Sequence, residues 1–268
     1  MLRFADRDTT RLLQTGDPEP VEWINSTGAS PLFLTCEHAG RAIPAALGDL
    51  GIPAAEMNRH IAYDVGAEGV ARSLAERLDA ALILQRYSRL VIDCNRPFEA
   101  KDCVVQESDG TPVPANADIS DLDRRRRFVE IHQPLHEAIA TALDQRHASG
   151  KPLLLVSVHS FTPVMRATGA VRDFELGLLY NHDARLAERL AQTFHAANPD
   201  VTVKLNAPYH VDDISDYTIP VHGERRGIAH VLLEIRNDLI NDARGQEEWA
   251  NRLAGPLRLA ADSLEGTA

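Results

Sequence analysis

The sequence predicts an α/β protein, a three-layer α/β/α sandwich around a mostly parallel or mixed central sheet. Short runs rich in Val, Ile and Leu recur along the chain, and longer segments with helical spacing of apolar residues lie between them. This alternation is typical of a sheet covered by helices on both faces. No internal repeat and no long low-complexity linker interrupts the 268 residues, so we expect one domain.

Seven short apolar runs predict strands. In chain order they are PLFLTC (31–36), ALILQ (81–85), RLVIDC (89–94), LLLVSVH (153–159), ELGLLY (175–180), VTVKL (201–205) and HVLLEI (230–235). Runs of this kind are continuous rather than alternating, which favours strands that are buried on both sides of the sheet.

Helical periodicity and turn-rich composition account for the rest of the chain. The predicted helices span residues 64–78, 121–147, 183–197 and 244–263. In the first of them Val70 and Leu74 lie four positions apart, on one face. Segments 99–120 and 162–174 are polar and predict surface loops. Loops of that length in a compact domain are more often functional than idle.

Composition limits the classes of partner. The chain carries 28 Lys and Arg against 39 Asp and Glu, a formal charge of −11, which argues against nucleic acid or an anionic membrane as the main partner. The basic cluster Arg124–Arg127 is interpreted as a solvated helix face. No run has the roughly 18 apolar residues of a membrane span, and MLRFADRDTT at the N-terminus lacks an apolar signal region. A cytoplasmic location is therefore expected.

The cysteines do not predict a cross-linked or zinc-stabilised fold. The chain has an odd number of cysteines, namely Cys36, Cys94 and Cys103, and no two of them form a CxxC motif. We therefore expect neither a disulfide framework nor a structural zinc knuckle. Cys36 and Cys94 are interpreted as small core residues.

Polar side chains stand where the predicted strands end. They are Glu37 and His38, Asn95 and Arg96, His159 and Ser160, and Glu234 and Arg236, with Asp64 at the start of a predicted helix. In open α/β sheets ligands collect beyond the carboxyl ends of the strands. Two imidazoles, carboxylates and an amide–guanidinium pair together indicate a mononuclear metallohydrolase that acts on an anionic substrate.

Five motifs give the chain a resemblance to a known family. CEHAG, HIAYDVGA, YSRLVIDCNRP, VSVHSFTP and HVLLEIRNDLI occur in the family's order from about residue 31 to 250, and they resemble the shorter, less characterised branch of the N-formylglutamate amidohydrolases. That family is similar to zinc-dependent exopeptidases and aspartoacylase-like deacylases, which implies a zinc-exopeptidase-like fold. The resemblance also implies the site residues: His38, Asp64 and His159 as metal ligands, Asn95 and Arg96 as binders of a substrate carboxylate, and Glu234 as the base.

One departure from the related exopeptidases leaves the acidic ligand open. Those enzymes place it three residues after the first His, where this chain has Arg41. Either Asp64 or Glu37 then takes the position. We favour Asp64, because adjacent residues at a strand end tend to point to opposite sides.

Other polar residues have alternative interpretations. Asp64 could serve only as a helix N-cap, and Asn95 with Arg96 could close a turn before Pro97. Arg89 is open between substrate binding and a structural salt bridge. The remaining residues with open or lesser roles are His60 as a further ligand, His132 and His136 as a surface or supporting pair on a helix face, and Tyr209, His222 and Arg225 as a pocket rim. Ser160 lacks the G-x-S-x-G elbow of a nucleophile.

These observations, together with the resemblance, predict a metal-dependent amidohydrolase. The metal is expected to be zinc or another divalent transition metal, and the substrate a small anionic N-acyl amino acid. N-formyl-L-glutamate, giving formate and glutamate, is the first choice. The alternatives are a deacylase or carboxypeptidase-like hydrolase acting on another N-acyl amino acid, and a non-catalytic protein that binds a metal or an amino acid. The native metal and the oligomeric state, including a homo-oligomer, stay open.

Overall fold

A mixed seven-stranded sheet forms the centre of the molecule, in a computed structural model that describes residues 11–265. The strand order is β1-β3-β2-β6-β9-β7-β8. The strands are β1 (Val21–Ile24), β2 (Leu32–Cys36), β3 (Ala81–Gln85), β6 (Leu154–Phe161), β7 (Leu176–Leu179), β8 (Val203–Leu205) and β9 (Ala229–Arg236). The N-terminal segment MLRFADRDTT, where the sequence predicts no signal region, lies outside the described residues.

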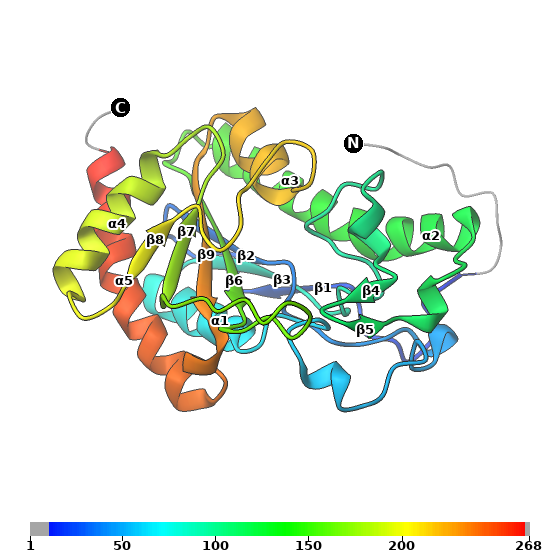
Figure 1. The fold of residues 1–268 in the computed structure, drawn as a ribbon. Coiled ribbons are helices and arrows are strands. Elements are labelled where there is room, and N and C mark those ends of the chain that lie inside the picture. The colour runs from blue at the N-terminus through cyan, green and yellow to red at the C-terminus, as the bar shows by residue number, and fades with distance from the viewer. Residues whose placement is uncertain (1–10, 266–268) are drawn as a thin grey trace.

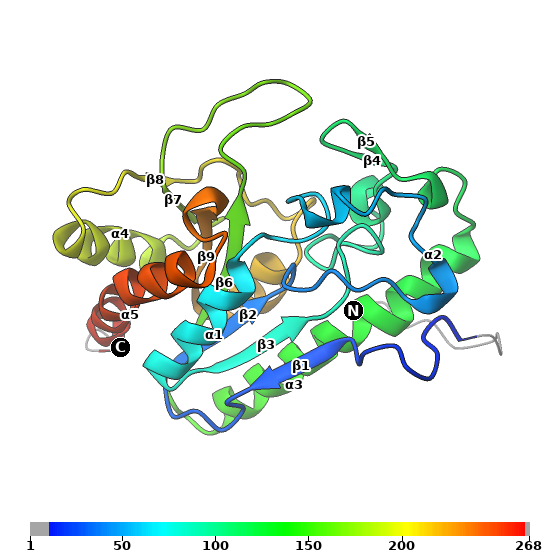
Figure 2. The ribbon, with the colours of Figure 1, turned by 90° about the horizontal axis from the view of Figure 1, so that it is seen from below.

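The inner strands of the sheet are parallel and its edges break the pattern. β3, β2, β6 and β9 pair in parallel, whereas β1 is antiparallel to β3 and β7 is antiparallel to β9. Figure 2 shows β1 running opposite to β3. The four central strands are almost wholly buried, as their continuous apolar runs predict.

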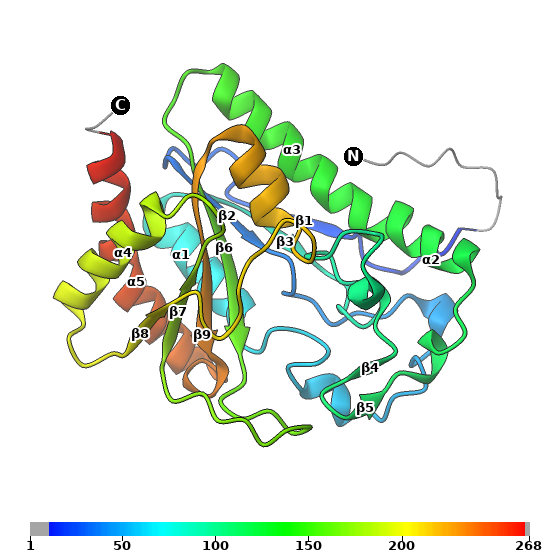
Figure 3. The ribbon, with the colours of Figure 1, turned by 45° about the horizontal axis from the view of Figure 1, so that its top comes forward.

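Helices cover both faces of the sheet (Figures 1 and 3). One face packs against α1 (Ala67–Leu78), α4 (Arg185–Ala197) and α5 (Ala243–Glu265), whose apolar residues share a core with alternate strand positions such as Val158 and Leu233. The other face packs against α3 (Gln133–Ala148) and the buried loops beside it. The predicted three-layer α/β/α sandwich with a mixed sheet is therefore confirmed.

The run RLVIDC (89–94) is not a strand, and this prediction was wrong. Residues 89–91 form a turn closed by the Val91 amide on the Ser88 carbonyl, and the segment pairs with no strand. Leu90, Val91 and Ile92 are nevertheless at most 1% exposed, because they pack in the core beside α3. A run of apolar residues indicates that the segment is buried, but not that it is a strand. Residues 89–94 are buried as a loop.

The remaining differences from the sequence prediction are local. β1 was not predicted, since VEWI is short and partly exposed at the edge of the sheet. The predicted helix 121–147 is confirmed as α2 (Asp121–Arg127) and α3, joined by one π-helical turn. The segment 99–120 contains a small hairpin, β4 (Glu107–Ser108) and β5 (Thr111–Pro112).

The two long predicted loops meet on one side of the molecule (Figure 2). Asp109, at the tip of the β4–β5 hairpin, accepts hydrogen bonds from the amides of Arg166 and Ala167 at 3.1 and 2.8 Å. Within residues 11–265, no helix has the length and apolarity that crossing a bilayer requires. Cys36, Cys94 and Cys103 are buried free thiols.

Candidate metal centre

Three segments bring polar side chains to one edge of the sheet. His38 follows β2, His159 lies near the end of β6, and Asp64 precedes α1, with its amide bonded to the His38 carbonyl at 2.9 Å. Val158 packs on the α1, α4 and α5 face, so its neighbour His159 points to the opposite face. The site therefore lies at the carboxyl ends of β2 and β6, on the α3 side.

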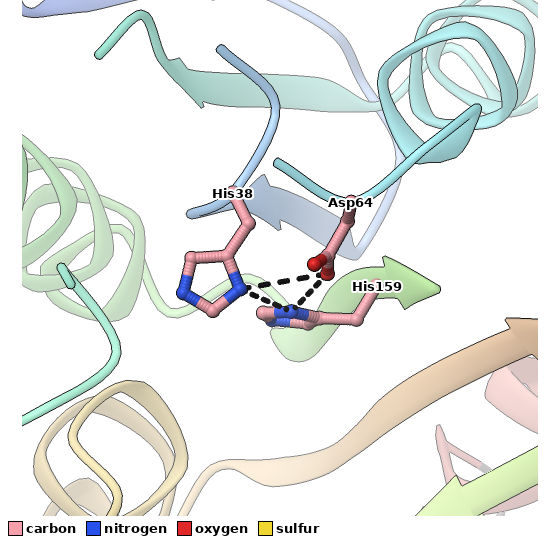
Figure 4. Close-up of side chains that lie close together, drawn as sticks. All are labelled: His38, Asp64 and His159. Carbon is pink, nitrogen blue, oxygen red and sulfur yellow. Dashed lines mark hydrogen bonds and ion pairs between the residues drawn. The ribbon is translucent and has the colours of Figure 1, made fainter. Parts of the chain in front are cut away.

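Three ligand atoms converge there. His159 Nδ1 lies 3.2 Å from His38 Nδ1 and 2.9 Å from Asp64 Oδ2, and His38 Nδ1 lies 3.5 Å from Asp64 Oδ2 (Figure 4). All three side chains are buried. Among the residues that the structure describes, this is the group of His, Cys, Asp or Glu residues whose atoms are close enough to hold one metal ion. Asp64 is not the N-cap of α1, which begins after Gly66.

The second nitrogen of each imidazole is bound by a carboxylate. His38 Nε2 pairs with Asp93 Oδ1 at 2.7 Å, and His159 Nε2 pairs with Glu37 Oε2 at 2.9 Å. Such pairs fix the orientation of metal-binding histidines and leave the other nitrogen free for the ion. Glu37 thus contacts the side of His159 that faces away from the ligand cluster, whereas Asp64 contributes to the cluster.

The supporting carboxylates are ionised. Burial alone would raise the pKa of Glu37, but its hydrogen bond and charge interaction with His159 hold that pKa well below the usual range. Burial likewise opposes ionisation of Asp93, where the charges of Arg89 and His38 hold the pKa well below normal. Arg89 binds Asp93 Oδ2 at 2.6 Å and Asp64 Oδ1 at 3.4 Å, so its cation balances both carboxylates.

Glu234 stands next to the ligand cluster. It lies directly opposite His159 in the parallel pairing of β6 with β9, and its Oε2 atom is buried without a hydrogen-bond partner. Burial raises the pKa of Glu234 to about 8, against the opposing charge of His159. On its other side is Gly177, where a Cβ would come within 2.0 Å of the Ala207 carbonyl oxygen. This glycine lets the chain before Tyr209 approach the site.

A polar pocket of about 330 Å³ is lined by His38, Asp64, His159, Arg89 and Glu234. Its lining includes His38, His60, Asp64, Arg89, Asn95, Arg96, His159, Ser160, Tyr209, His210, Ser215, Asp216 and Glu234. The pocket therefore joins the three candidate ligands, the buried carboxyl group of Glu234 and several hydrogen-bond donors in one cavity.

Asn95 and Arg96 reach this pocket from a turn. The sequence places them at the end of a strand, which is wrong, because residues 89–94 form no strand. Both residues bind Asp216: Asn95 Nδ2 lies 3.3 Å and Arg96 Nη1 lies 3.1 Å from its Oδ1 atom. Arg96 Nε also binds Asp102 at 2.9 Å.

Comparison with known proteins assigns the family. A family model described as N-formylglutamate amidohydrolase matches residues 30–241. The chain belongs to that family. A search of curated proteins gave no match.

Two solved structures share the fold of this chain over nearly its whole length. A gene product from Agrobacterium tumefaciens, Atu2144, is 35% identical, with a TM-score of 0.90 over 95% of this chain and 100% of that chain. N-formylglutamate amidohydrolase from Ralstonia eutropha JMP134 is 17% identical, with a TM-score of 0.66 over 94% of this chain and 100% of that chain. The second likeness shows the shared fold alone.

The ligand set fits the zinc or other divalent transition metal that the family resemblance implies. Two imidazole nitrogens, which give up their protons when an ion binds, and one carboxylate oxygen are a common donor set for a catalytic zinc ion, which keeps a further position open. The carboxylate partners on His38 and His159 match the support that such ligands need. His38, Asp64 and His159 could hold such an ion.

Other residues singled out in the sequence divide into two groups. His60, Ser160 and Tyr209 line the pocket, although the Ser160 hydroxyl donates to the Val65 carbonyl. Outside the pocket lining are His132, His136 and His222, which are buried, and Arg225, which is exposed. His132 and His136 bind the carbonyls of Arg96 and Cys94, and so support the turn that carries Asn95.

Sequence reasoning missed two carboxylates of the site. Asp93 was counted as part of a strand, although a charged residue inside an apolar run is itself a sign of a buried ion pair. Asp216 lies 120 residues from Arg96, and a single sequence holds no signal for that pairing.

Proposed function

We propose that this protein is a metal-dependent amidohydrolase that cleaves the acyl amide of an acidic N-acyl amino acid, most readily N-formyl-L-glutamate. The observation that carries the proposal is the position of Glu234, buried beside His159 in the pocket that contains His38 and Asp64. Family membership supports the same class of reaction.

The chemistry divides between a bound ion and the side chains of the chain. A divalent ion on His38, Asp64 and His159 would polarise the acyl carbonyl and lower the pKa of a water molecule. Glu234 takes a proton from the water molecule as the water oxygen attacks the acyl carbon. Glu234 then delivers that proton to the amine nitrogen, which leaves as the acyl C–N bond breaks. The carboxyl group of Glu234 is buried and has no hydrogen-bond partner on Oε2, so it is available for proton transfer in the pocket.

Recognition of the amino-acid carboxylate is assigned to Asn95 and Arg96. Both side chains line the pocket and present N–H donors to a carboxylate oxygen, as they do to Asp216. Arg89 is held by Asp93 and Asp64, so we assign it to balancing the charge of the ligands and not to the substrate. The partner is thus a small anionic molecule, and the buried free thiols are consistent with the proposed cytoplasmic location.

The test is a hydrolysis screen of the zinc-loaded protein. N-formyl, N-acetyl and longer N-acyl derivatives of Glu, Asp and Gln are compared by kcat/KM, with the α-carboxamide of each substrate as the match that lacks the α-carboxylate. Arg96→Ala should lower kcat/KM on the acids about 30- to several-thousand-fold and affect the amides far less. A preference for longer acyl groups would favour the deacylase alternative.

Two outcomes of that screen would oppose the proposal. No hydrolysis of any acid, by a protein that binds zinc, would favour a non-catalytic binding protein. Equal losses on acid and amide in Arg96→Ala would show that Arg96 holds the site together and does not bind the substrate carboxylate.

A further inference from the structure

The donors that the proposed function assigns to a substrate carboxylate already bind a carboxylate of the chain. Asp216 Oδ1 accepts from both Asn95 Nδ2 and Arg96 Nη1, at 3.3 and 3.1 Å. One oxygen receiving an amide and a guanidinium N–H is the arrangement expected for a bound carboxylate ligand. Asp216 lines the pocket with the metal ligands, whereas Asp102, the other partner of Arg96, is outside its lining.

Asp216 belongs to a turn that is closed on itself. Its Oδ2 atom accepts from the Asp212 amide at 3.1 Å, and the Asp212 carboxylate accepts from the Ile214 and Ser215 amides at 2.7 Å each. Ile214, at the tip of the turn, is 84% exposed. The turn 212–216 therefore keeps its shape by internal bonds. It is tied to the pocket wall through Asp216 and, on the exposed side, to Asn181 and His182 through Asp213.

The chain on either side of this turn is anchored independently. Val211 is buried, and so is Thr218, whose amide donates to Asn95 Oδ1 at 3.0 Å. The side-chain oxygen of Asn95 thus holds the chain after the turn, and its side-chain nitrogen holds Asp216. The bond to Asp216 can be exchanged while the bond to Thr218 stays in place.

We propose that Asp216 is a specificity-determining residue, an internal carboxylate that the substrate carboxylate replaces on Asn95 and Arg96. The inference rests on the proposed function, because that function directs the substrate to these donors. Exchange of one carboxylate for another leaves Arg96 paired before and after binding. An uncharged ligand that took the place of Asp216 would leave the Arg96 cation without an anion in the pocket. The loss of that ion pair is costly in a partly buried site.

Charge repulsion favours replacement over joint binding. Two carboxylates within hydrogen-bond reach of one guanidinium group repel each other when both are ionised. The Asp216 carboxylate is also confined, with a side chain only 11% exposed. A second anion on Arg96 is therefore best accommodated when the 212–216 turn moves away.

The first experiment measures the affinity of the zinc-loaded protein for glutarate by calorimetry. Glutarate carries two carboxylates and has no amide to hydrolyse. Asp216→Asn removes the charge of the competitor and should bind glutarate about tenfold more tightly than the wild type. Asp102→Asn is the matched control, because Asp102 is 55% exposed on the other side of Arg96, and it should change the affinity less than twofold. Glutaramide should gain nothing from Asp216→Asn.

A second measurement detects the movement itself, in a protein that keeps Asp216. A fluorophore is attached to Ile214→Cys, which labels selectively because the native cysteines are buried. Glutarate should change the emission of this protein with the same midpoint as the calorimetric binding. The doubly substituted Asp216→Asn, Ile214→Cys protein should show a smaller change or none.

Three results would overturn the inference: glutarate binding equal to or weaker than wild type in Asp216→Asn, no binding to either protein, or binding to the wild type without a change in emission. These results are separate from the test of the proposed function. If Asp216→Asn tightens glutarate binding while no N-acyl amino acid is hydrolysed, the hydrolase assignment fails and the carboxylate exchange stands.

Discussion

At the scale of single residues, both histidines of the candidate metal centre use both ring nitrogens. In each case Nδ1 faces the ligand cluster and Nε2 binds a carboxylate, Asp93 for His38 and Glu37 for His159. The two acidic residues that the sequence left as alternatives are thus placed differently: Asp64 lies among the ligand atoms and Glu37 behind His159. Their different positions lead to different expectations for metal binding.

Asp64→Ala is expected to lose the metal, and Glu37→Gln to retain it with affinity lowered about 10- to 100-fold. The reason is that Asp64 supplies a ligand atom, while Glu37 orients one, and the glutamine can still accept from His159. Competition of each variant against a chromophoric chelator measures the two affinities. Wild-type affinity in Asp64→Ala, with loss of metal in Glu37→Gln, would exchange the two assignments.

Glu234→Gln is expected to keep the fold and the metal while kcat falls by about 10² to 10⁴, the usual contribution of a positioned proton-transfer group. The substitution preserves size, and Glu234 Oε2 has no hydrogen-bond partner to lose. Steady-state kinetics on the best substrate of the screen measures the loss, and metal content and a melting curve serve as controls. A variant within threefold of the wild type would exclude Glu234 as the base.

At the scale of elements, α3 and the π-helical turn before it support the site from behind. His132 Nε2 binds the Arg96 carbonyl at 2.9 Å and His136 Nε2 binds the Cys94 carbonyl at 2.7 Å, so both imidazoles act as donors to the turn that carries Asn95. Burial lowers the pKa of His132 to about 4 and that of His136 to about 3. Both therefore stay neutral in the folded protein at mildly acidic pH.

These low pKa values predict a loss of stability in mild acid. Below about pH 6.5 the unfolded chain binds a proton at each of these histidines and the folded protein does not, so the free energy of unfolding falls as the pH drops from 6.5 toward the folded values. For one such histidine the loss between pH 7.5 and 5.5 is about 1.4 kcal/mol. At pH values above 6.5 the contribution is constant.

His132→Phe is expected to remove the proton that the unfolded chain binds at position 132, and with it that residue's share of the pH dependence of the free energy of unfolding. The variant loses the hydrogen bond to the Arg96 carbonyl and should be about 1 to 3 kcal/mol less stable at pH 7.5, but its deficit should shrink by about 1.4 kcal/mol at pH 5.5. Urea unfolding of both zinc-loaded proteins at the two pH values measures the difference. A deficit that stays constant or grows would show that His132 is not a buried neutral histidine.

The elements also show where the sequence is informative. The strands of the inner sheet were predictable because strands buried on both faces leave continuous apolar runs, and His38 and His159 were identified as strand-end residues within motifs. RLVIDC has the same composition but is buried as a loop, so composition could not separate the two. The pairing of Arg96 with Asp216 joins positions 120 residues apart, and a single sequence does not show which distant residues come into contact when the chain folds.

At the scale of the whole molecule, the candidate metal centre ties together parts of the chain that are distant in sequence. Its ligands come from the end of β2, the segment before α1 and the end of β6, and Arg89 and Asp93 add the turn after β3. An ion bound there contacts only the folded chain, because the three ligand atoms converge nowhere in the unfolded state. Metal binding should therefore appear as stability of the entire domain.

Removal of the metal is expected to lower the Tm of the wild type by about 5 to 10 °C. A ligand present at 100 times its Kd stabilises the folded state by about 2.7 kcal/mol, and each kcal/mol shifts Tm by about 2 to 4 °C for a chain of this size. Melting curves with saturating zinc and with excess chelator measure the shift. Asp64→Ala is the matched control, and its Tm should be the same in both conditions, because the carboxylate ligand is gone. An equal shift in the two proteins would place the stabilising ion away from His38, Asp64 and His159, and no shift in the wild type would argue against a metal bound with useful affinity.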